Sequence, residues 1–218
     1  MSPDRPMTDR LWSDTASDVH WPLHGPRSIH AHLTQPIVQQ LVKANSHSVL
    51  DLGCGNGWFS GALHRCGFDM TGVDHSGAAL REARQLYPEV PFRHMDATAP
   101  PDASLPPKFD AVVAIDLIDH VARPRQLIET AIAALRPGGL LVMTSTYHGY
   151  SKNLALALTG RFDARWEALL DQGRLKFFSR ATLLTLMSEF ALRDLHFETV
   201  GRIPIFARAM LVAATKPG

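Results

Sequence analysis

Short apolar segments alternate with amphipathic ones between residues 48 and 145, and this alternation limits the fold more than any other feature. The apolar segments 48–52, 70–73 and 110–115 lack a strict two-residue period, as expected of strands that are covered on both faces. The segments that separate the strands include predicted helices of about ten residues. The sequence therefore predicts an α/β fold with a doubly wound, mostly parallel sheet.

The expected elements continue to the end of the chain. Strands are predicted over 48–52, 70–73, 92–94, 110–115 and 140–145, and helices over 28–43, 58–66, 77–86 and 124–135. Pro36 is expected to split the first helix, and Pro137 with Gly138 suits a type II turn before the fifth strand. Ser179 is a good N-cap for a helix over 179–190. The segments 192–199 and 207–215 look like two closing strands.

The 218 residues suit one large domain over 28–218, preceded by an irregular arm over 1–27. Lys and Arg number 22 against 21 Asp and Glu, which argues against a nucleic-acid binder. Cys54 and Cys66 form neither a disulfide framework nor a metal-type spacing, which fits a reducing cytoplasm. Neither a signal peptide nor a transmembrane segment is visible.

A glycine-rich turn follows the first predicted strand, in the run Asp51-Leu52-Gly53-Cys54-Gly55-Asn56-Gly57. Glycines there let the backbone approach a ligand closely, and the next helix offers unpaired N–H groups. The spacing differs from the G-x-G-x-x-G of dinucleotide-binding proteins, because Ser60 takes the third position counted from Gly55. Asp51 would repel a pyrophosphate but suits an ammonium group. A tight turn without a ligand is the alternative.

Two further acids lie where the predicted strands end, which is where ligands bind in such sheets. Asp74, followed by His75, can accept two hydrogen bonds from a ribose diol, or can cap the next helix. Asp96, followed by Ala97, can accept from an adenine amino group, or can be a solvated loop acid. Their joint occurrence at successive strand ends favours a nucleoside site.

With these residues, the chain resembles the class I S-adenosylmethionine-dependent methyltransferases, most of all the O-methyltransferases of ubiquinone biosynthesis. The resemblance covers about residues 47–145, including Arg136-Pro137-Gly138-Gly139. It implies a Rossmann-like, seven-stranded sheet that ends in an antiparallel strand pair. It also implies a cofactor site in which the glycine loop with Cys54 and Asn56 holds the methionine part, Asp74 with His75 holds the ribose, Asp96 and Ala97 face the adenine, and Ile115 lines the pocket.

The trio Asp116, Asp119 and His120 follows the fourth strand, beside the expected methyl group. The similar O-methyltransferases carry Glu-x-x-Glu-His here, and in some of them the trio binds a divalent cation. Two carboxylates and an imidazole could hold Mg²⁺, Mn²⁺ or Zn²⁺ and lower the pKa of a phenol. The alternatives are a catalytic role without metal, with His120 as general base beside Asp119, and a structural one.

The segment 151–171 is expected to be a lid over a hydrophobic acceptor, with Leu154 and Leu158 one helical turn apart. His148 is a candidate acceptor-side residue, and basic residues beside the leucines also suit shallow contact with an anionic membrane surface. The alternative is that these leucines complete the core.

The resemblance implies methyl transfer to a small molecule, with a hydroxyl oxygen favoured and nitrogen or carbon acceptors open. A nicotinamide-dependent oxidoreductase is disfavoured, because none of the three tyrosines lies in a Tyr-x-x-x-Lys pattern. A non-catalytic protein that only binds the cofactor remains a rival.

Overall fold

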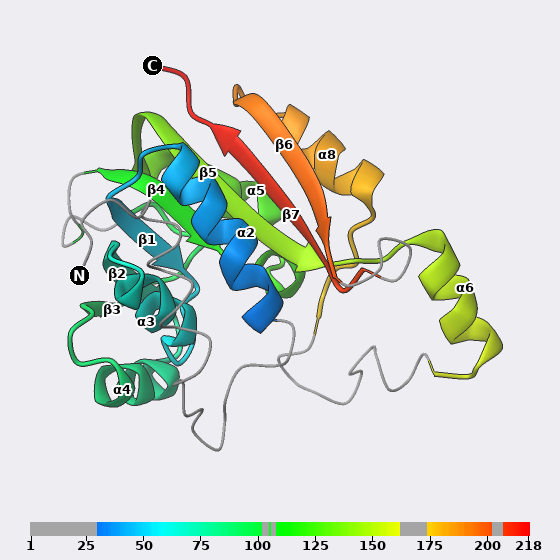
Figure 1. Cartoon of the computed structure of the whole chain (residues 1–218), viewed down its shortest axis with the longest axis horizontal. Helices are drawn as coiled ribbons and strands as arrows, with labels where there is room; N and C mark the ends of the chain where they lie inside the picture. Colours follow the sequence, from blue (N-terminus) through cyan, green and yellow to red (C-terminus); the bar gives the residue numbers. More distant parts are fainter. Residues whose placement is uncertain (1–29, 102–104, 106–107, 162–173, 202–206) are drawn as a thin grey trace, which may run out of the picture.

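The computed structural model describes residues 30–101, 105, 108–161, 174–201 and 207–218. Within them, a seven-stranded sheet has the strand order β3-β2-β1-β4-β5-β7-β6 (Figure 1). Its strands are β1 Ser48–Leu52, β2 Asp69–Asp74, β3 Phe92–His94, β4 Phe109–Ala114, β5 Leu135–Thr146, β6 Arg193–Val200 and β7 Ala209–Thr215. The pairings among β1 to β5 are parallel, and β7 is antiparallel to β5 and β6. The predicted fold class is confirmed. The arm over 1–27 lies outside the described residues.

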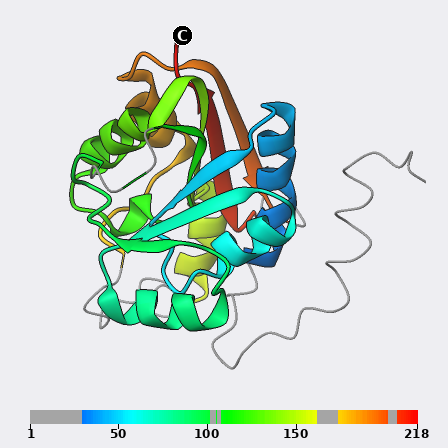
Figure 2. The same cartoon turned by 90° about the vertical axis from the view of Figure 1, so that its left-hand side faces the viewer.

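Helices cover both faces of the sheet, as Figure 2 shows from the side. One face is covered by α2 His30–Lys43, α3 Trp58–Arg65 and α4 Gly77–Leu86, and the other by α5 Pro124–Ala134 and α8 Arg180–Ser188. Successive β1 residues alternate between the two cores, with Val49 in the first and Leu50 in the second. Burial on both faces therefore explains why the strand sequences are apolar throughout.

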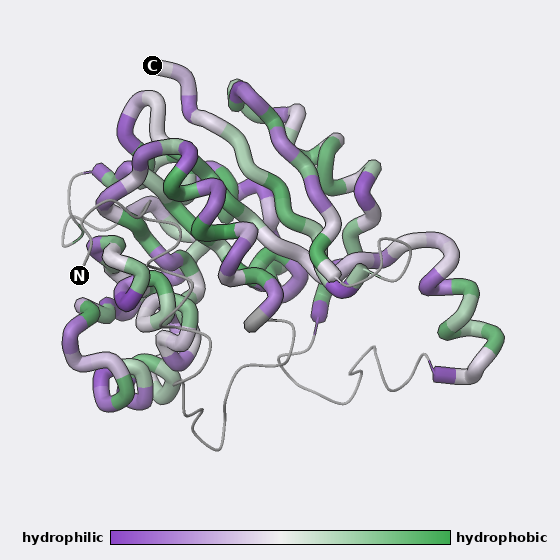
Figure 3. Tube along the Cα trace, viewed as in Figure 1, coloured by the Kyte–Doolittle hydropathy of each residue, from purple (hydrophilic) through white to green (hydrophobic). Residues whose placement is uncertain are grey.

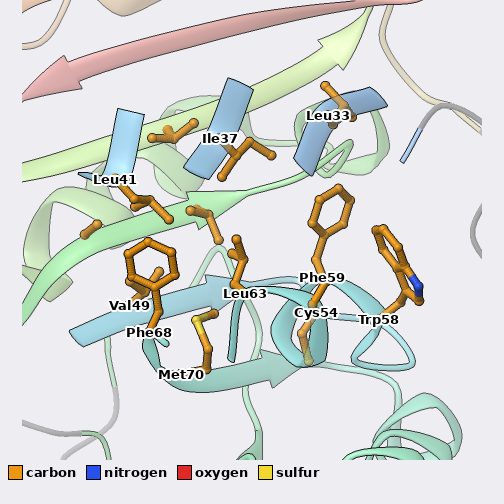
Figure 4. Packing of buried hydrophobic residues seen from close by; sticks show 14 of the residues in the cluster. Leu33, Ile37, Leu41, Val49, Cys54, Trp58, Phe59, Leu63, Phe68 and Met70 are labelled. Atoms are coloured by element: carbon orange, nitrogen blue, oxygen red, sulfur yellow. The ribbon is translucent and has the colours of Figure 1, made fainter. Parts of the chain in front are cut away.

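Helix α2 is continuous, so the expectation that Pro36 splits it is wrong. Leu33, Ile37 and Leu41 are fully buried against the sheet, and Figure 4 shows them in a row above Val49 and Leu63. A proline inside a helix costs about 3 kcal/mol, whereas each buried leucine or isoleucine contributes roughly 1.5–3 kcal/mol. Packing against the sheet therefore outweighs the hydrogen bond that the proline removes.

The fifth strand begins earlier than the sequence predicts. Helix α5 ends at Ala134, and β5 already starts at Leu135, which pairs with Phe109. The turn after Leu135 includes Gly138 at φ +74°, whose N–H donates to the carbonyl of Lys216 at 3.0 Å. Pairing of the turn with the end of β7 thus adds these residues to the strand.

Asp110 connects the start of β1 to Arg136 in β5, at the amino ends of the strands and opposite the expected site. Its carboxylate accepts hydrogen bonds from the N–H groups of His47 at 2.8 Å and Ser48 at 2.9 Å, and it forms an ion pair with Arg136. Burial alone would raise the pKa of Asp110, but these N–H bonds and the guanidinium outweigh it and lower the pKa to about 2. The carboxylate is therefore ionised at neutral pH.

Candidate cofactor and acceptor site

Strands β1 and β4 are adjacent, and the chain winds away from them in opposite directions. In open α/β sheets, this point leaves a crevice at the carboxyl ends of the strands. The loops after β1, β2, β3 and β4 all end at that edge, because these strands are parallel. The topology therefore brings the four groups of predicted site residues to one edge of the sheet.

The glycine loop is tightly packed at both ends and open in the middle. Its glycines Gly53, Gly55 and Gly57 have φ values of +79°, +55° and +79°. A Cβ on Gly53 would lie 2.7 Å from the side chain of Leu117, and one on Gly57 would lie 2.7 Å from Phe92. A Cβ on Gly55 would meet nothing within 4 Å. The loop thus leaves free space at Gly55.

Asp51 lies beneath this loop and is almost completely buried. Its carboxylate accepts a hydrogen bond of 2.6 Å from the hydroxyl of Ser60 on α3. Gly57 caps α3 with its backbone alone, since no side-chain hydrogen bond is made at that cap. Asp51 therefore joins β1 to the start of α3, and the helix N-terminus remains a favourable environment for a carboxylate.

Asp74 ties the glycine loop to the end of β2. Its carboxylate accepts from the N–H of Gly55 at 2.9 Å and from the N–H of Ser76 at 2.7 Å. The exposed ring of His75 lies 3.4 Å away. Each carboxylate oxygen has a second lone pair, so Asp74 can still accept hydrogen bonds from a diol. The helix-cap role falls to Ser76, whose hydroxyl accepts from Ala79.

Asp96 is exposed at the end of β3, between buried Met95 and Ala97. It accepts from the N–H and the hydroxyl of Thr98, both at 2.8 Å, and these two bonds lower its pKa. An ionised acceptor at the rim next to a buried Ala97 suits an amino group on a flat ring.

Cys54 and Ile115 contribute an apolar lining. Cys54 is buried, and burial raises the pKa of its thiol, so the thiol stays protonated at neutral pH. Ile115 is half-buried against the same core. Both fit packing against a ligand better than chemistry. Asn56 faces away toward α4, where its amide donates to Glu82 at 3.3 Å.

The structure does not support the expected cation site. Asp119 lies in the short 3₁₀ helix η1 Ile118–His120 and is fully buried. Its carboxylate accepts from the Ser145 hydroxyl at 2.7 Å and from the Thr146 N–H at 3.0 Å. Among the described residues, no group of three or more His, Cys, Asp or Glu side chains could hold a metal ion. Asp119 is therefore enclosed by protein donors, and direct contact with a metal or an acceptor does not fit it.

The neighbours of Asp119 differ from it in exposure. Asp116 and His120 are half-buried. Asp116 has φ +51°, and its N–H donates to the Thr144 hydroxyl at 2.9 Å. A left-handed conformation in a residue other than glycine is uncommon and is often found at functional sites. Asp116 and His120 are therefore more exposed than Asp119, and His120 is the only member of the trio with an imidazole ring.

Helix α6 Tyr150–Leu158 stands away from the end of β5 (Figure 1), with apolar residues along it (Figure 3). Leu154 is 46% exposed and Leu158 is 79% exposed, so these two leucines do not complete the core. The base of α6 is anchored by buried Lys152, whose ammonium donates to the carbonyls of Tyr147 and Ala207. The rest of the expected lid, residues 162–173, lies outside the described residues.

His148 follows β5 and packs edge-on against Phe177, with ring centroids 5.1 Å apart. Sequence reasoning missed Phe177, and it also missed Arg174, whose Nε atom lies 3.8 Å from the Asp119 carboxylate. Nothing in their spacing connects them to the strand ends, because the segment 174–179 returns to the site only in three dimensions.

A cavity of about 670 Å³ lies elsewhere, between the start of α5 and α8. Its lining includes Arg123, Lys176 and Phe178 but none of the glycine-loop residues. The chemistry at the strand ends, not the size of this cavity, therefore identifies the candidate site.

Comparisons with known proteins identify the family of this chain. A family described as a methyltransferase domain matches residues 27–196. The ubiquinone biosynthesis O-methyltransferase of Methylobacterium sp. (strain 4-46) is 35% identical over 115 residues, which are 52% of this chain and 46% of that protein. The protein of the same name from Albidiferax ferrireducens is 30% identical over 174 residues, which are 72% of this chain and 68% of that protein. The matched part of this chain spans about half the length of several such relatives.

Among solved structures, the magnesium protoporphyrin IX methyltransferase from Synechocystis PCC 6803 with bound SAH is similar, with a TM-score of 0.62 and 17% identity. The alignment covers 96% of this chain and 93% of that one. At 17% identity, this similarity shows a shared fold and nothing about the substrate.

Proposed function

This chain belongs to the methyltransferase-domain family as an S-adenosylmethionine-dependent methyltransferase, and we propose that it methylates a hydroxyl of a small hydrophobic or aromatic acceptor. The observation that carries the proposal is the edge formed by the open loop at Gly55 and the carboxylate of Asp74. A ribose diol at Asp74 would lie beside that open space. Asp96 and Ala97 follow the adjacent strand and would face the adenine.

The choice of oxygen as the methyl acceptor rests on the relatives, which are named O-methyltransferases. Because several of these relatives are matched over about half their length, nitrogen and carbon acceptors are the alternatives that the test must include. The net charge of +1 gives no reason to expect a nucleic-acid acceptor.

The bound sulfonium supplies an electrophilic methyl group. The acceptor oxygen forms a bond to that methyl carbon as the carbon–sulfur bond breaks, and S-adenosylhomocysteine leaves. The protein therefore needs to position the acceptor, exclude water and remove the hydroxyl proton. We assign the proton to His120, which lies at the carboxyl end of β4 and is half-buried.

The exposed apolar side chains of α6 support a hydrophobic acceptor. Tyr150, Leu154 and Leu158 are spaced by four residues, and all three are exposed. We propose that α6 closes over the acceptor, or lies against a membrane surface from which a hydrophobic acceptor is taken.

In the described part of the chain, no helix has the length and apolar character needed to cross a bilayer. Cys54 and Cys66 are free, which supports a reducing, cytoplasmic setting.

The test is turnover by the purified protein with S-adenosylmethionine and a panel of catechols, followed as S-adenosylhomocysteine by mass spectrometry. Matched controls are the anilines and the dimethyl ethers of the same rings, each with and without an alkyl tail. Turnover of catechols but not of their ethers supports O-methylation, and faster turnover of anilines would replace it by N-methylation. Cofactor binding without turnover of any acceptor would favour the non-catalytic alternative, and tight NAD binding would contradict the cofactor assignment.

A further inference from the structure

Asp119 connects three segments that are far apart in the sequence. Its side chain accepts from Ser145 and Thr146 at the end of β5, at 2.7 Å and 3.0 Å. Its backbone carbonyl accepts from the N–H groups of Leu175 at 2.8 Å and Lys176 at 3.0 Å. The Nε atom of Arg174 lies 3.8 Å from the Asp119 carboxylate. One residue after β4 therefore holds both the end of β5 and the segment that returns toward α8.

The three joined segments carry the residues that we assign to the acceptor side. His120 is the next residue after Asp119. Thr146 leads through Tyr147 to His148, and Lys176 is followed by Phe177, which packs against His148. The His148–Phe177 contact thus joins two segments whose starting points are both bonded to Asp119.

The burial of Asp119 separates this role from direct catalysis. Its side chain is 1% exposed and that of Arg174 is 12% exposed, so the pair is shielded from solvent. Both carboxylate oxygens accept hydrogen bonds from protein groups. An enclosed charge of this kind is kept only where its partners compensate for the loss of water, and removal of the carboxylate leaves those partners without their acceptor.

We propose that Asp119 is a positioning residue for the methyl acceptor, which fixes His120 and the His148–Phe177 pair at the site without touching the acceptor. This inference rests on the proposed function for the identity of the ligand, but the connection between the three segments is independent of it. The cofactor residues Asp74 and Asp96 lie at the ends of other strands, where their carboxylates accept from Gly55 and Thr98 respectively.

The test compares Asp119→Ala, Asp119→Asn and Ser145→Ala with the full chain. An asparagine can accept from Ser145 through its one carbonyl oxygen, but its amide cannot accept from the Thr146 N–H. We expect Asp119→Ala to raise the acceptor KM about tenfold or more, with Asp119→Asn and Ser145→Ala in between. Affinity for S-adenosylhomocysteine is expected to change less than about twofold, because the cofactor site is separate.

Hydrogen exchange gives a readout that needs no acceptor. In Asp119→Ala, the amides of 146–148 are expected to exchange faster, because Thr146 loses its side-chain acceptor. The amides of 174–177 are expected to follow to a smaller extent, because Arg174 loses its carboxylate partner while the backbone carbonyl of residue 119 is kept. The amides of β2 are expected to stay protected. Asp110→Ala is the matched control, because Asp110 also accepts from two backbone N–H groups and pairs with an arginine, but at the opposite end of the sheet. It is expected to lower stability without a change in acceptor KM.

The outcomes separate the two proposals. Unchanged exchange at both 146–148 and 174–177 in Asp119→Ala overturns the positioning role, whatever the activity. An equal rise in acceptor KM in Asp110→Ala also overturns it, because the effect would then follow general stability. If the wild-type protein turns over no acceptor while exchange at 174–177 rises in the variants, the connection stands and the proposed function fails.

Discussion

The N–H of Gly55 donates to the carboxylate of Asp74 at 2.9 Å, so the residue expected to bind the ribose also fixes the shape of the glycine loop. One substitution at Asp74 therefore acts on the cofactor site in two ways: it removes a charged acceptor for the ligand, and it frees the loop. Because both effects are local to the ends of β1 and β2, they can be measured as cofactor affinity.

Asp74→Ala is expected to weaken binding of S-adenosylmethionine by about 1.5–3 kcal/mol, since a buried charged acceptor is lost. Isothermal titration calorimetry of the wild type and the variant measures this difference. Asp69→Ala is the control, because Asp69 lies at the other end of β2 and is exposed. Equal affinities of Asp74→Ala and wild type would remove Asp74 from the cofactor site.

Alanine substitutions in the glycine loop are expected to have different effects at two positions. At Gly53, a Cβ would lie 2.7 Å from Leu117 at φ +79°, so Gly53→Ala is expected to lower the free energy of unfolding by about 2 kcal/mol or more. At Gly55, an added Cβ would meet nothing within 4 Å, so Gly55→Ala is expected to cost about 1 kcal/mol for the left-handed backbone alone.

For cofactor affinity, we expect the opposite order, with the larger effect at Gly55. The Cβ of Gly55→Ala would project into the open space that we assign to the ligand, so this variant is expected to bind S-adenosylmethionine at least tenfold more weakly. Urea unfolding and calorimetry on the same samples separate the two effects. Normal cofactor binding by a folded Gly55→Ala variant would place the ligand elsewhere.

Chelation is expected to leave the activity unchanged, because the Asp119 carboxylate is enclosed by Ser145 and Thr146 and does not form a metal site with its neighbours. The measurement is turnover after dialysis against an excess of EDTA, compared with turnover after added Mg²⁺ or Mn²⁺. A loss of activity in EDTA that Mg²⁺ restores would return the trio to a metal-binding role.

The residues that we assign to the cofactor are easier to group from the sequence than those that we assign to the acceptor, for a physical reason. Gly53 follows β1, Asp74 is the last residue of β2 and Asp96 lies two residues beyond β3, so their place at one edge of the sheet comes from strand ends alone. The partners of Asp119 come from 145–146 and 174–176, and only the folded chain brings them together. A spacing of Asp116, Asp119 and His120 that suits a metal therefore could not reveal that Asp119 faces inward.

The errors in the fold have a similar origin. Pro36 is a reliable signal for a helix break in an isolated segment, but the packing of Leu33 and Ile37 against the sheet overrides it. The early start of β5 depends on Leu135 pairing with Phe109 and on Gly138 bonding to Lys216. Both contacts join residues that are distant in the sequence, and local propensity does not contain them.

Asp110 makes the stability of the domain sensitive to acid. Its pKa is about 2 in the folded state, below the ordinary value of 3.8, because its N–H partners and Arg136 outweigh the effect of burial. A lowered pKa means that the stabilisation is present above the unfolded-state pKa and is lost as the pH falls toward the folded-state value. The shift corresponds to about 2 kcal/mol.

Asp110→Ala is therefore expected to lower the free energy of unfolding by about 2 kcal/mol at neutral pH. The difference from wild type should shrink as the pH falls from about 4 to about 2, where the wild-type carboxylate becomes protonated. Urea unfolding at several pH values measures it, with the exposed Asp69→Ala as the control. A difference that is independent of pH would show that Asp110 acts through packing and not through its charge.

The exposed leucines of α6 distinguish a lid from a part of the scaffold. Leu154 and Leu158 are 46% and 79% exposed, so the double change Leu154→Ser and Leu158→Ser is expected to alter stability by less than about 0.5 kcal/mol per site. If α6 closes over a hydrophobic acceptor, the same change removes apolar contact from the bound state only. The acceptor KM is then expected to rise about tenfold, with unchanged affinity for S-adenosylmethionine.

Two control variants separate an effect on the acceptor KM from an effect on stability. Ala157→Ser changes an exposed residue of the same helix without removing a large apolar group, and it is expected to leave the KM unchanged. Leu127→Ala empties a fully buried position in α5 and is expected to cost about 2–5 kcal/mol of stability. A double α6 variant that loses as much stability as Leu127→Ala would make α6 part of the scaffold. A stable double variant with an unchanged KM for every acceptor would place the acceptor away from α6, because a helix that contacts a hydrophobic ligand cannot lose two leucines without weakening that contact.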